Sequence, residues 1–546
     1  MIYLLYALLA VLALLVVLLA IAVMRTLLMP SKISEYQPKA DPRAETHAQK
    51  LSQMIQYETV SRPDDLQREK FLGFHKVLEE LFPLVHQHLE KTELEGSLLF
   101  YWKGEQHDKP IVLMSHQDVV PAEGVWEHAP FSGDIADGKV WGRGTADTKA
   151  SVMAFFQACE ELLEQGYTPQ QDVYLASSCT EEVGGPGATM LVNEMTRRGV
   201  KPYLVCDEGG AIIQNPIGGV NGNYAMVGVF EKGKANVKFT ARSSGGHASA
   251  PPRKSPIARL AAFADSMEKH SPFQKKIMPE VAAMFTALAP YATFPMKLLF
   301  GNLWLFGPVL KIAMPFVSGQ AAAMLQTTCA FTMQKGSDAC NVLPQEANLW
   351  ANLRFIPHQG MEESLALIRQ RAEQYGLEME VEEGGDFTPP VDIHGEPWQQ
   401  VMAAIDKTFP GLPASPYVMT GATDCTFWQG ICDSCIRFAP RHLRTRADEG
   451  YARPEREYLG RLPARRGGFL QESHRFEQIN NKAALQNAHS LRHSEPVITL
   501  AWESALSSIG KRIATPFYRT VRNDRLAFCN AAFCLPLTRE VAWRKP

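Results

Sequence analysis

Four short stretches of this 546-residue chain combine a histidine or carboxylates with glycines or other small residues. They are Ser115-His116-Gln117-Asp118, the Gly-rich segment 142–149 around Asp147, Glu181-Glu182-Val183-Gly184-Gly185 and Cys206-Asp207-Glu208-Gly209-Gly210. Taken singly, each has an ordinary explanation, such as a structural histidine, an Asp that caps a helix or a solvated charge pair. Imidazole and carboxylate groups are, however, also the usual ligands of catalytic zinc.

These stretches follow short apolar runs, such as 111–114, 173–176 and 203–206, which are typical of buried strands. In open α/β sheets, ligands bind in the crevice at the carboxyl ends of the strands. We therefore expect His116, Asp147, Glu182 and Asp207 to converge on one crevice. Carboxylates so close together repel one another unless a multivalent cation neutralises them. Mixed imidazole and carboxylate ligation favours Zn²⁺, with Mn²⁺ or Co²⁺ as alternatives.

The order of the motifs His-x-Asp, Gly-x-x-Asp-x-Lys, Glu-Glu-x-Gly-Gly and Asp-Glu-Gly resembles the signature of the M20 family of two-zinc metallopeptidases. The similarity covers about residues 50 to 440. The sequences of the segments 115–121, 142–149 and 250–252 resemble those of the carboxypeptidase S-like branch. The resemblance implies that His116 and Asp207 bind one zinc, that Glu182 binds the other and that Asp147 bridges the two.

Two further acidic residues complete the site that the resemblance implies. Glu181 would be the general base, and Asp118 would orient the ring of His116. Two Zn²⁺ ions against the three ligand carboxylates leave a net charge of about +1, which favours a bound hydroxide. Glu181, adjacent to a ligand but not itself a ligand, could then take a proton and pass it to the leaving amine.

Three residues farther along the chain match family positions that contact the substrate. His247, in Ser244-Gly245-Gly246-His247-Ala248, would reach a neighbouring active site and stabilise the developing oxyanion. Asn341 and Arg354 would bind the substrate backbone and carboxylate, for which the guanidinium fork is well suited. The partner implied is a peptide or an N-acyl amino acid, and a homodimer is expected.

The pattern of apolar runs predicts an α/β fold with an inserted domain. Alternating strand-like and helix-like segments predict an α/β layer fold for residues 51–226 and 358–440. The resemblance implies that this part is the mixed-sheet zinc-peptidase catalytic domain. Residues 227–357 contain β-rich ribbons around a helix near 255–269, which indicates an inserted α+β lid or dimerisation domain. Its apolar stretch 282–324 is cut by four prolines, which favours buried packing or an oligomer contact over a second membrane span.

The N-terminus predicts a single-pass membrane protein. Ile2 to Met24 is a run of 23 residues without a charge, long enough to cross a hydrocarbon core of roughly 30 Å. We assign residues 1–28 to a transmembrane or signal-anchor helix, with a cleavable signal peptide as the alternative. The polar, proline-containing residues 29–50 are expected to form a linker. Arg25 and Lys32 favour a cytoplasmic C-terminal side only weakly, so the topology stays open.

The C-terminal part has a different composition. Residues 1–440 hold 36 Lys and Arg against 48 Asp and Glu, whereas 441–546 hold 19 against 10. The family requires one more zinc-binding histidine after a turn like Gly421-Ala422-Thr423-Asp424, but the expected segment is missing. One choice of codons for 448–457, read one base later, gives Met-Lys-Gly-Met-His-Gly-Leu-Asn-Glu-Asn-Ile, which resembles it. We therefore hypothesise a frameshift near Pro440.

Several alternatives follow from these observations. His442 or His474 could replace the missing ligand. The function expected is a zinc-dependent hydrolase of carboxypeptidase or dipeptidase type, with an N-acyl amino acid acylase as a close alternative. A membrane protein that lost turnover with its last zinc ligand is a third possibility. The basic tail lacks a nucleic-acid-binding motif, so no nucleic-acid partner is expected.

Overall fold

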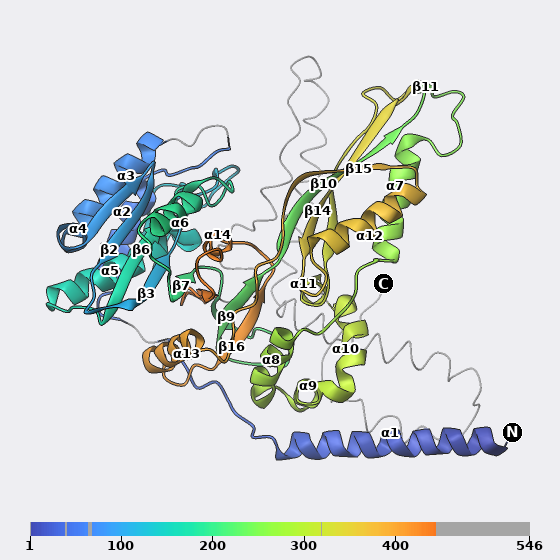
Figure 1. Cartoon of the computed structure of the whole chain (residues 1–546), viewed down its shortest axis with the longest axis horizontal. Coiled ribbons are helices and arrows are strands. Elements are labelled where there is room, and N and C mark those ends of the chain that lie inside the picture. Colours follow the sequence, from blue (N-terminus) through green and yellow to red (C-terminus); the bar gives the residue numbers. More distant parts are fainter. Residues whose placement is uncertain (1, 39–40, 64–67, 318, 444–546) are drawn as a thin grey trace, which may run out of the picture.

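The computed structural model describes residues 2–38, 41–63, 68–317 and 319–443, in which helices cover two separate β-sheets (Figure 1). The larger sheet is mixed and has the order β1-β2-β6-β3-β7-β17-β9-β8-β18, with β16 paired to β9. Its strands are β1 (Glu90–Leu94), β2 (Ser97–Trp102), β3 (Gln106–Met114), β6 (Gln171–Ser177), β7 (Leu204–Asp207), β8 (Ala211–Gln214), β9 (Asn223–Glu231), β16 (Ala414–Met419), β17 (Cys435–Arg437) and β18 (His442–Leu443).

Both faces of the β2 side of this sheet are buried, because its side chains alternate between two cores. Leu98, Phe100 and Trp102 of β2 pack on one face, and Leu99 packs on the other. This alternation is the period of two that a strand imposes on its side chains. The first face is covered by α2 (Ala44–Gln56), α3 (Arg68–Leu81), α4 (Pro83–His88) and α5 (Ala150–Glu164), and the second by α6 (Gly187–Arg197) and α14 (Cys425–Trp428).

Parallel pairing brings the predicted site segments to one edge of the larger sheet. Strand β3 pairs in parallel with β6 on one side and with β7 on the other. Their carboxyl ends therefore lie next to one another, and each continues into one of the acidic stretches. The expected mixed α/β architecture is confirmed for this part of the chain.

The smaller sheet is antiparallel and has the order β12-β14-β10-β15. Its strands are β10 (Gly233–Arg242), β12 (Thr328–Lys335), β14 (Glu346–Phe355) and β15 (Glu378–Gly385), and α7 (Pro256–Lys269) and α12 (Met361–Gln374) share its core. Two short hairpins also form, β4 (Ile135–Ala136) with β5 (Lys139–Val140) and β11 (Gly246–His247) with β13 (Val342–Leu343). The smaller sheet thus extends past residue 357, the end that we expected for the inserted segment.

The apolar, proline-rich stretch is helical. It forms α8 (Pro279–Leu288), η2 (Ala289–Tyr291), α9 (Phe294–Phe300), α10 (Leu303–Val317) and α11 (Gly319–Ala323). Much of it packs against β9 of the larger sheet, in a core shared with α13 (Glu396–Thr408). Buried packing was one of the two expectations for this stretch, and it holds for the side chains that face β9.

The most apolar 18 residues of the N-terminal helix α1 (Ile2–Leu28) have a mean hydropathy of 3.3, and the length and composition of the helix are sufficient to cross a membrane. The chain after it is held against the body. The Nζ of Lys297 donates to the carbonyl of Met29 (2.6 Å), and the Oγ of Ser34 donates to the carbonyl of Asn223 (2.6 Å). The first part of the expected linker is therefore docked on the protein.

Candidate metal and active site

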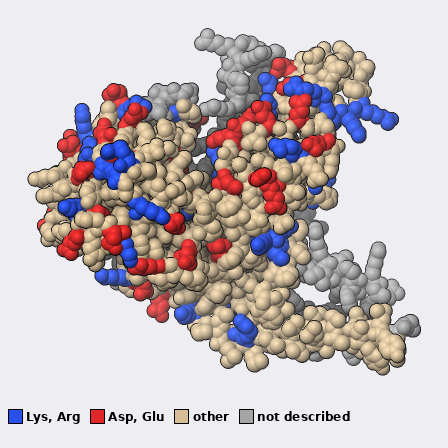
Figure 2. All heavy atoms as spheres, in the orientation of Figure 1, with Lys and Arg blue, Asp and Glu red and all other residues tan. Residues whose placement is uncertain are grey.

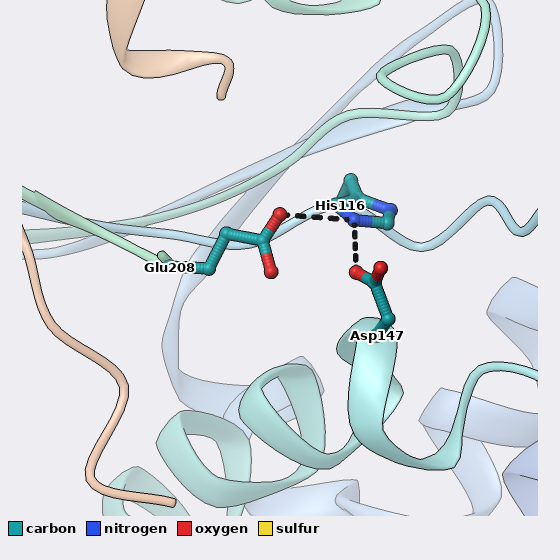
Figure 3. Close-up of side chains that lie close together, drawn as sticks. All are labelled: His116, Asp147 and Glu208. Atoms are coloured by element: carbon teal, nitrogen blue, oxygen red, sulfur yellow. Dashed lines mark hydrogen bonds and ion pairs between the residues drawn. The ribbon is translucent and has the colours of Figure 1, made fainter. Parts of the chain in front are cut away.

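Three of the acidic stretches meet around one imidazole (Figure 3). His116 follows β3, Glu208 follows β7, and Asp147 lies in the short helical turn η1 (Thr145–Lys149) that precedes α5. The Nε2 of His116 lies 3.2 Å from the Oδ1 of Asp147 and 3.2 Å from the Oε1 of Glu208. One nitrogen and two oxygens of these residues lie within 4.8 Å of one another, as a metal centre requires.

Asp118 organises the loop that carries the two glutamates. Its buried carboxylate accepts hydrogen bonds from the backbone amides of Glu181 and Glu182, both at 3.1 Å, and from the hydroxyl of Ser61 at 2.6 Å. The Nδ1 of His116 lies 2.9 Å from the backbone carbonyl of Asp118 and 3.4 Å from its Oδ1. Asp118 therefore touches both the imidazole and the Glu181-Glu182 backbone, and the second contact was not expected from the sequence.

Glu181 lies at the edge of the same group, with its Oε2 at 4.0 Å from the Nε2 of His116. Burial raises the pKa of Glu181 well above its usual value, although His116 opposes the shift. Burial also raises the pKa of Glu182 to about 8, with the carboxylates of Asp147 and Asp118 adding to the effect. Without a cation, these side chains therefore bind protons strongly.

We selected Asp207 as the zinc ligand of its stretch, and the structure describes its surroundings together with those of its neighbour Glu208. Both oxygens of the buried Asp207 carboxylate accept backbone hydrogen bonds, from the amide of Glu208 (2.8 Å) and from that of Cys425 (3.0 Å). Glu208, one residue later, extends its carboxylate to His116. Burial raises the pKa of Asp207, and the neighbouring Glu208 raises it further.

Asp424 is a further acidic residue near the site that we did not select from the sequence. It is buried, and its Oδ2 accepts a hydrogen bond from the hydroxyl of Ser178, in the loop that follows β6. Burial raises its pKa to about 7, while the Ser178 hydroxyl opposes the shift. The available signal was its place as the last residue of the turn 421–424, directly before α14 (Cys425–Trp428).

The segment in which we expected the family's last histidine, 448–457, lies outside the described residues, and Arg441 is the first basic residue of the tail that leads to it. The Nη2 of Arg441 lies 3.9 Å from the Oε2 of Glu208. His442, one of the two suggested replacement ligands, pairs with β8 through β18, and its Nε2 lies 3.2 Å from the hydroxyl of Tyr36. His474 and the tail from residue 444 onward lie outside the described residues.

The three expected substrate contacts lie on the smaller sheet and its hairpin. His247 is exposed on β11, its Nδ1 is 2.8 Å from the Oγ of Ser249, and the carbonyl of Asn341 accepts a hydrogen bond from the amide of Ala248. Arg354 lies on β14, where its Nε donates to the Oδ1 of Asn352. In Figure 1, the β11 hairpin lies far from the end of β7, so one chain does not bring His247 to its own His116.

The residues of the site suit a divalent cation. The Nε2 of His116 lies close to the carboxylates of Asp147 and Glu208, and burial raises the pKa of the neighbouring Glu181 and Glu182, so a cation would relieve the repulsion among these acids. Zinc accepts this donor set readily.

A family model described as Peptidase family M20/M25/M40 matches residues 112–458. The chain belongs to the M20 peptidase family. A "Probable carboxypeptidase S-like 2" of Dictyostelium discoideum is 30% identical over 429 residues, which cover 76% of this chain and 82% of that protein. The human "N-fatty-acyl-amino acid synthase/hydrolase PM20D1" is 32% identical over 416 residues, which cover 72% and 80% of the two chains.

Solved M20 structures share the fold. The M20 metallo-carboxypeptidase Sso-CP2 of Sulfolobus solfataricus has a TM-score of 0.52 at 16% identity, and the match covers 73% of this chain and 91% of that one. The dipeptidase Dug1p of Saccharomyces cerevisiae has a TM-score of 0.50 at 13% identity, covering 77% and 91%. The M20 family predicted from the sequence is thus confirmed, and the chain is an enzyme of the hydrolase class.

Proposed function

We propose that this M20 enzyme is a zinc-dependent hydrolase that cleaves an amide bond next to a free carboxylate. The observation that carries the proposal is the convergence of His116, Asp147 and Glu208, with Glu181 beside them. The relatives named as carboxypeptidases and as N-fatty-acyl-amino acid hydrolases both act next to a carboxylate, so the substrate is a peptide or an N-acyl amino acid. An acylase is the close alternative, because the pocket shape alone separates the two reactions.

The metal would be held by His116, Asp147 and Glu182, together with a carboxylate from the end of β7. The geometry favours Glu208 for that last position, since both oxygens of Asp207 already accept backbone amides. When bound, zinc would polarise the scissile carbonyl and lower the pKa of a water molecule.

The chain's own groups would then orient the substrate and move the proton. Glu181 is well placed to accept a proton and return it to the leaving amine, because its backbone is fixed by Asp118 while its carboxylate faces the imidazole of His116. Asn341 and Arg354 would hold the substrate backbone and carboxylate, and His247 would stabilise the oxyanion in the active site of a partner subunit.

We further propose that α1 anchors the enzyme in a membrane as a single span. The support is the length and hydropathy of α1, and a signal sequence is the alternative. Recovery of the intact N-terminus from membranes after carbonate extraction would separate the two.

Two substitutions test the catalytic proposal. Glu181→Gln should keep the bound zinc but lose at least two orders of magnitude in kcat, because it removes only the proton acceptor. Asp147→Ala should lose both zinc and activity, because it removes a ligand shared by the site. Metal content is measured by atomic absorption on the purified full chain, and hydrolysis is measured with N-acyl amino acids and dipeptides. An Asp147→Ala protein with unchanged zinc would contradict the assignment.

A second candidate is a membrane protein with impaired turnover, favoured by the lack of the expected histidine segment in the sequence that follows Gly421-Ala422-Thr423-Asp424. If the chain after Pro440 arises from a frameshift, the 546-residue protein should bind about one zinc tightly and a chain with the frame restored should bind two. Two tightly bound zincs and full activity in the 546-residue chain would refute this candidate.

A further inference from the structure

One face of α10 carries large apolar side chains that no other described part of the protein covers. Trp304, Val309, Ile312 and Phe316 are 49%, 56%, 67% and 71% exposed. At about 100° per residue they fall within roughly 140° of the helix circumference. Leu310 and Met314, on the opposite face, are buried in the core next to β9. We call the four exposed residues the α10 stripe; a cluster of this kind normally marks an interaction surface.

The stripe belongs to an element fixed on α1. Between α9 and α10, the buried Asn302 donates from its side-chain amide to the carbonyl of Ala22 (3.2 Å) and to the Oγ1 of Thr26 (3.0 Å). Lys297 of α9, also buried, donates to the carbonyl of Met29 and to the Oγ of Ser31. These contacts hold the α9–α10 corner against the last two turns of α1, as Figure 1 shows.

This attachment sets the depth of the corner in a bilayer. Helix α1 has 27 residues and is therefore about 40 Å long, against roughly 30 Å for a hydrocarbon core. Ala22 precedes the end of the helix at Leu28 by about 9 Å. If α1 spans the membrane, the α9–α10 corner lies at its edge, at the depth that interfacial helices reach.

The surface around the corner has the matching composition. In Figure 2, the area over α1, α9 and α10 is almost free of Lys, Arg, Asp and Glu, whereas the rest of this face is densely charged. The helices α9 and α10 are together apolar enough for a span, but they meet at 103°, and α10 contains Pro308 and Pro315. The pair α9 and α10 therefore cannot cross the membrane as one straight helix. It can still contact one leaflet.

We infer that the α10 stripe is a second membrane-contacting surface, which lies in the lipid interface beside α1 on the side of the catalytic body. The occupant is the bilayer, because the stripe continues the apolar surface of α1 and is attached to it by buried hydrogen bonds. The inference rests on the proposed anchoring by α1, and it does not depend on the proposed substrate.

The full chain in phosphatidylcholine nanodiscs provides the test, because Trp304 belongs to the stripe. Intrinsic tryptophan fluorescence is compared between ordinary lipids and lipids brominated in the upper part of the acyl chain. The signal of Trp304 is the spectrum of the parent protein minus the spectrum of the Trp304→Phe variant. The signal of Trp350, which lies on β14 of the smaller sheet, is obtained in the same way from the Trp350→Phe variant. We expect brominated lipid to reduce the Trp304 signal at least twofold and to leave the Trp350 signal unchanged.

The outcomes separate the proposals. A Trp304 signal that is equally bright in both lipids, in a chain recovered in the nanodisc fraction, would overturn the α10 surface and leave the α1 anchor intact. A chain that fails to enter nanodiscs would refute both. An unquenched Trp304 together with a dimer that dissociates in Ile312→Ser/Phe316→Ser would assign the stripe to a second copy instead. Equal melting temperatures of the variants and the parent establish that the surface changes leave the fold intact.

Discussion

At the scale of single residues, neighbouring acids in the site have different tasks. Asp207 is the last residue of β7 and accepts two backbone amides, whereas the next side chain, Glu208, lies beside His116. Asp207 therefore contacts two loop amides, while Glu208 belongs to the group that could hold a cation, and the ligand role of either residue stays a prediction.

This division predicts opposite effects of two conservative changes. Glu208→Gln should lower the zinc content strongly but the melting temperature of the metal-free protein only slightly, because its carboxylate faces His116 and the neutral amide keeps the shape of the side chain. Asp207→Asn should keep most of the zinc but lower stability by about 1–3 kcal/mol, because one buried amide loses its acceptor. Zinc analysis and thermal melting of the two variants, with the parent as control, distinguish the roles. Loss of zinc from Asp207→Asn alone would return the ligand role to Asp207.

The sequence predicted the stretches that converge, and the ligand that it named in each stretch stays a prediction. His116 could be selected because it follows an apolar run and is two residues from Asp118, and Asp147 and the Glu181-Glu182 pair because each precedes a helix or glycines. Adjacent acids such as Asp207 and Glu208 point in different directions, and the turn after the strand decides which one enters the site. Asp424 was missed for a related reason, since its proximity to Ser178 depends on long-range packing.

At the scale of elements, a buried ion pair joins β9 to β17 and to α14. The Nε of Arg437 donates to the Oε1 of Glu231 at 2.8 Å, and neither side chain is exposed. The hydroxyls of Thr423 and Thr426 donate to the same carboxylate, at 2.5 and 2.7 Å. The pair therefore holds the segment that begins α14, whose first backbone amide binds Asp207.

Breaking this pair should be costly, while replacing both partners should not be. Arg437→Met leaves the carboxylate of Glu231 buried without its cation, and we expect a loss of about 3–5 kcal/mol in the free energy of unfolding. The double variant Glu231→Gln/Arg437→Met should recover part of this loss, because the uncompensated charge is gone. Denaturant unfolding of the parent, the two single variants and the double variant gives the coupling free energy. Strictly additive effects would show that the two side chains do not depend on each other.

The extent of the smaller sheet could not be predicted from local sequence. Glu378 to Gly385 is rich in charge and was assigned to the catalytic part, but it pairs with β10 as the edge strand β15. Charged residues are common on exposed edge strands, so composition alone does not reveal which sheet such a strand joins. The division of the chain into domains accordingly stays a prediction.

At the scale of the whole molecule, the position of His247 predicts dependence on a second chain. The β11 hairpin lies far from the metal cluster of its own chain (Figure 1). If His247 serves a partner's site, mixing an inactive His247→Ala chain with an inactive Glu181→Gln chain should restore activity, because some heterodimeric sites then combine both intact residues. Fluorescence energy transfer between labelled chains verifies subunit exchange. Exchange without any recovery would count against this role.

The connection between the two sheets predicts a pH effect on stability. Lys232, the single residue between β9 and β10, is buried and donates to the carbonyls of Ala323 and Gln326. Burial, together with the charge of Arg354, lowers its pKa to about 7. In the unfolded chain the pKa is about 10.4, so between pH 7 and 10 the unfolded state binds more protons at this site. This residue should therefore make the protein more stable as pH rises, by up to about 1.4 kcal/mol per pH unit.

Replacement of this lysine isolates its contribution. Lys232→Met should flatten the rise of the melting temperature between pH 7 and 9, whereas Lys234→Met, on the more exposed part of β10, should leave it unchanged. Burial also lowers the pKa of Lys149 to about 7, but Lys149 is present in both variants, so its effect cancels. Equal slopes in all three proteins would contradict the assignment.

If the smaller sheet tilts as a rigid body relative to the larger sheet, the connection at Lys232 lies close to the axis of the rotation. The chain returns close to the same point, where the amides of Thr388 and Val391 donate to the carbonyls of Glu231 and Val229. Arg354 lies opposite Lys234, near this axis, and His247 lies beyond the far end of the ten-residue β10. At about 3.3 Å per residue that arm is roughly 33 Å long, so a tilt of about 10° displaces its tip by about 6 Å but Arg354 by only about 1 Å. A substrate carboxylate bound by Arg354 would therefore keep its position during such a tilt, whereas His247 would move with the tip of the sheet.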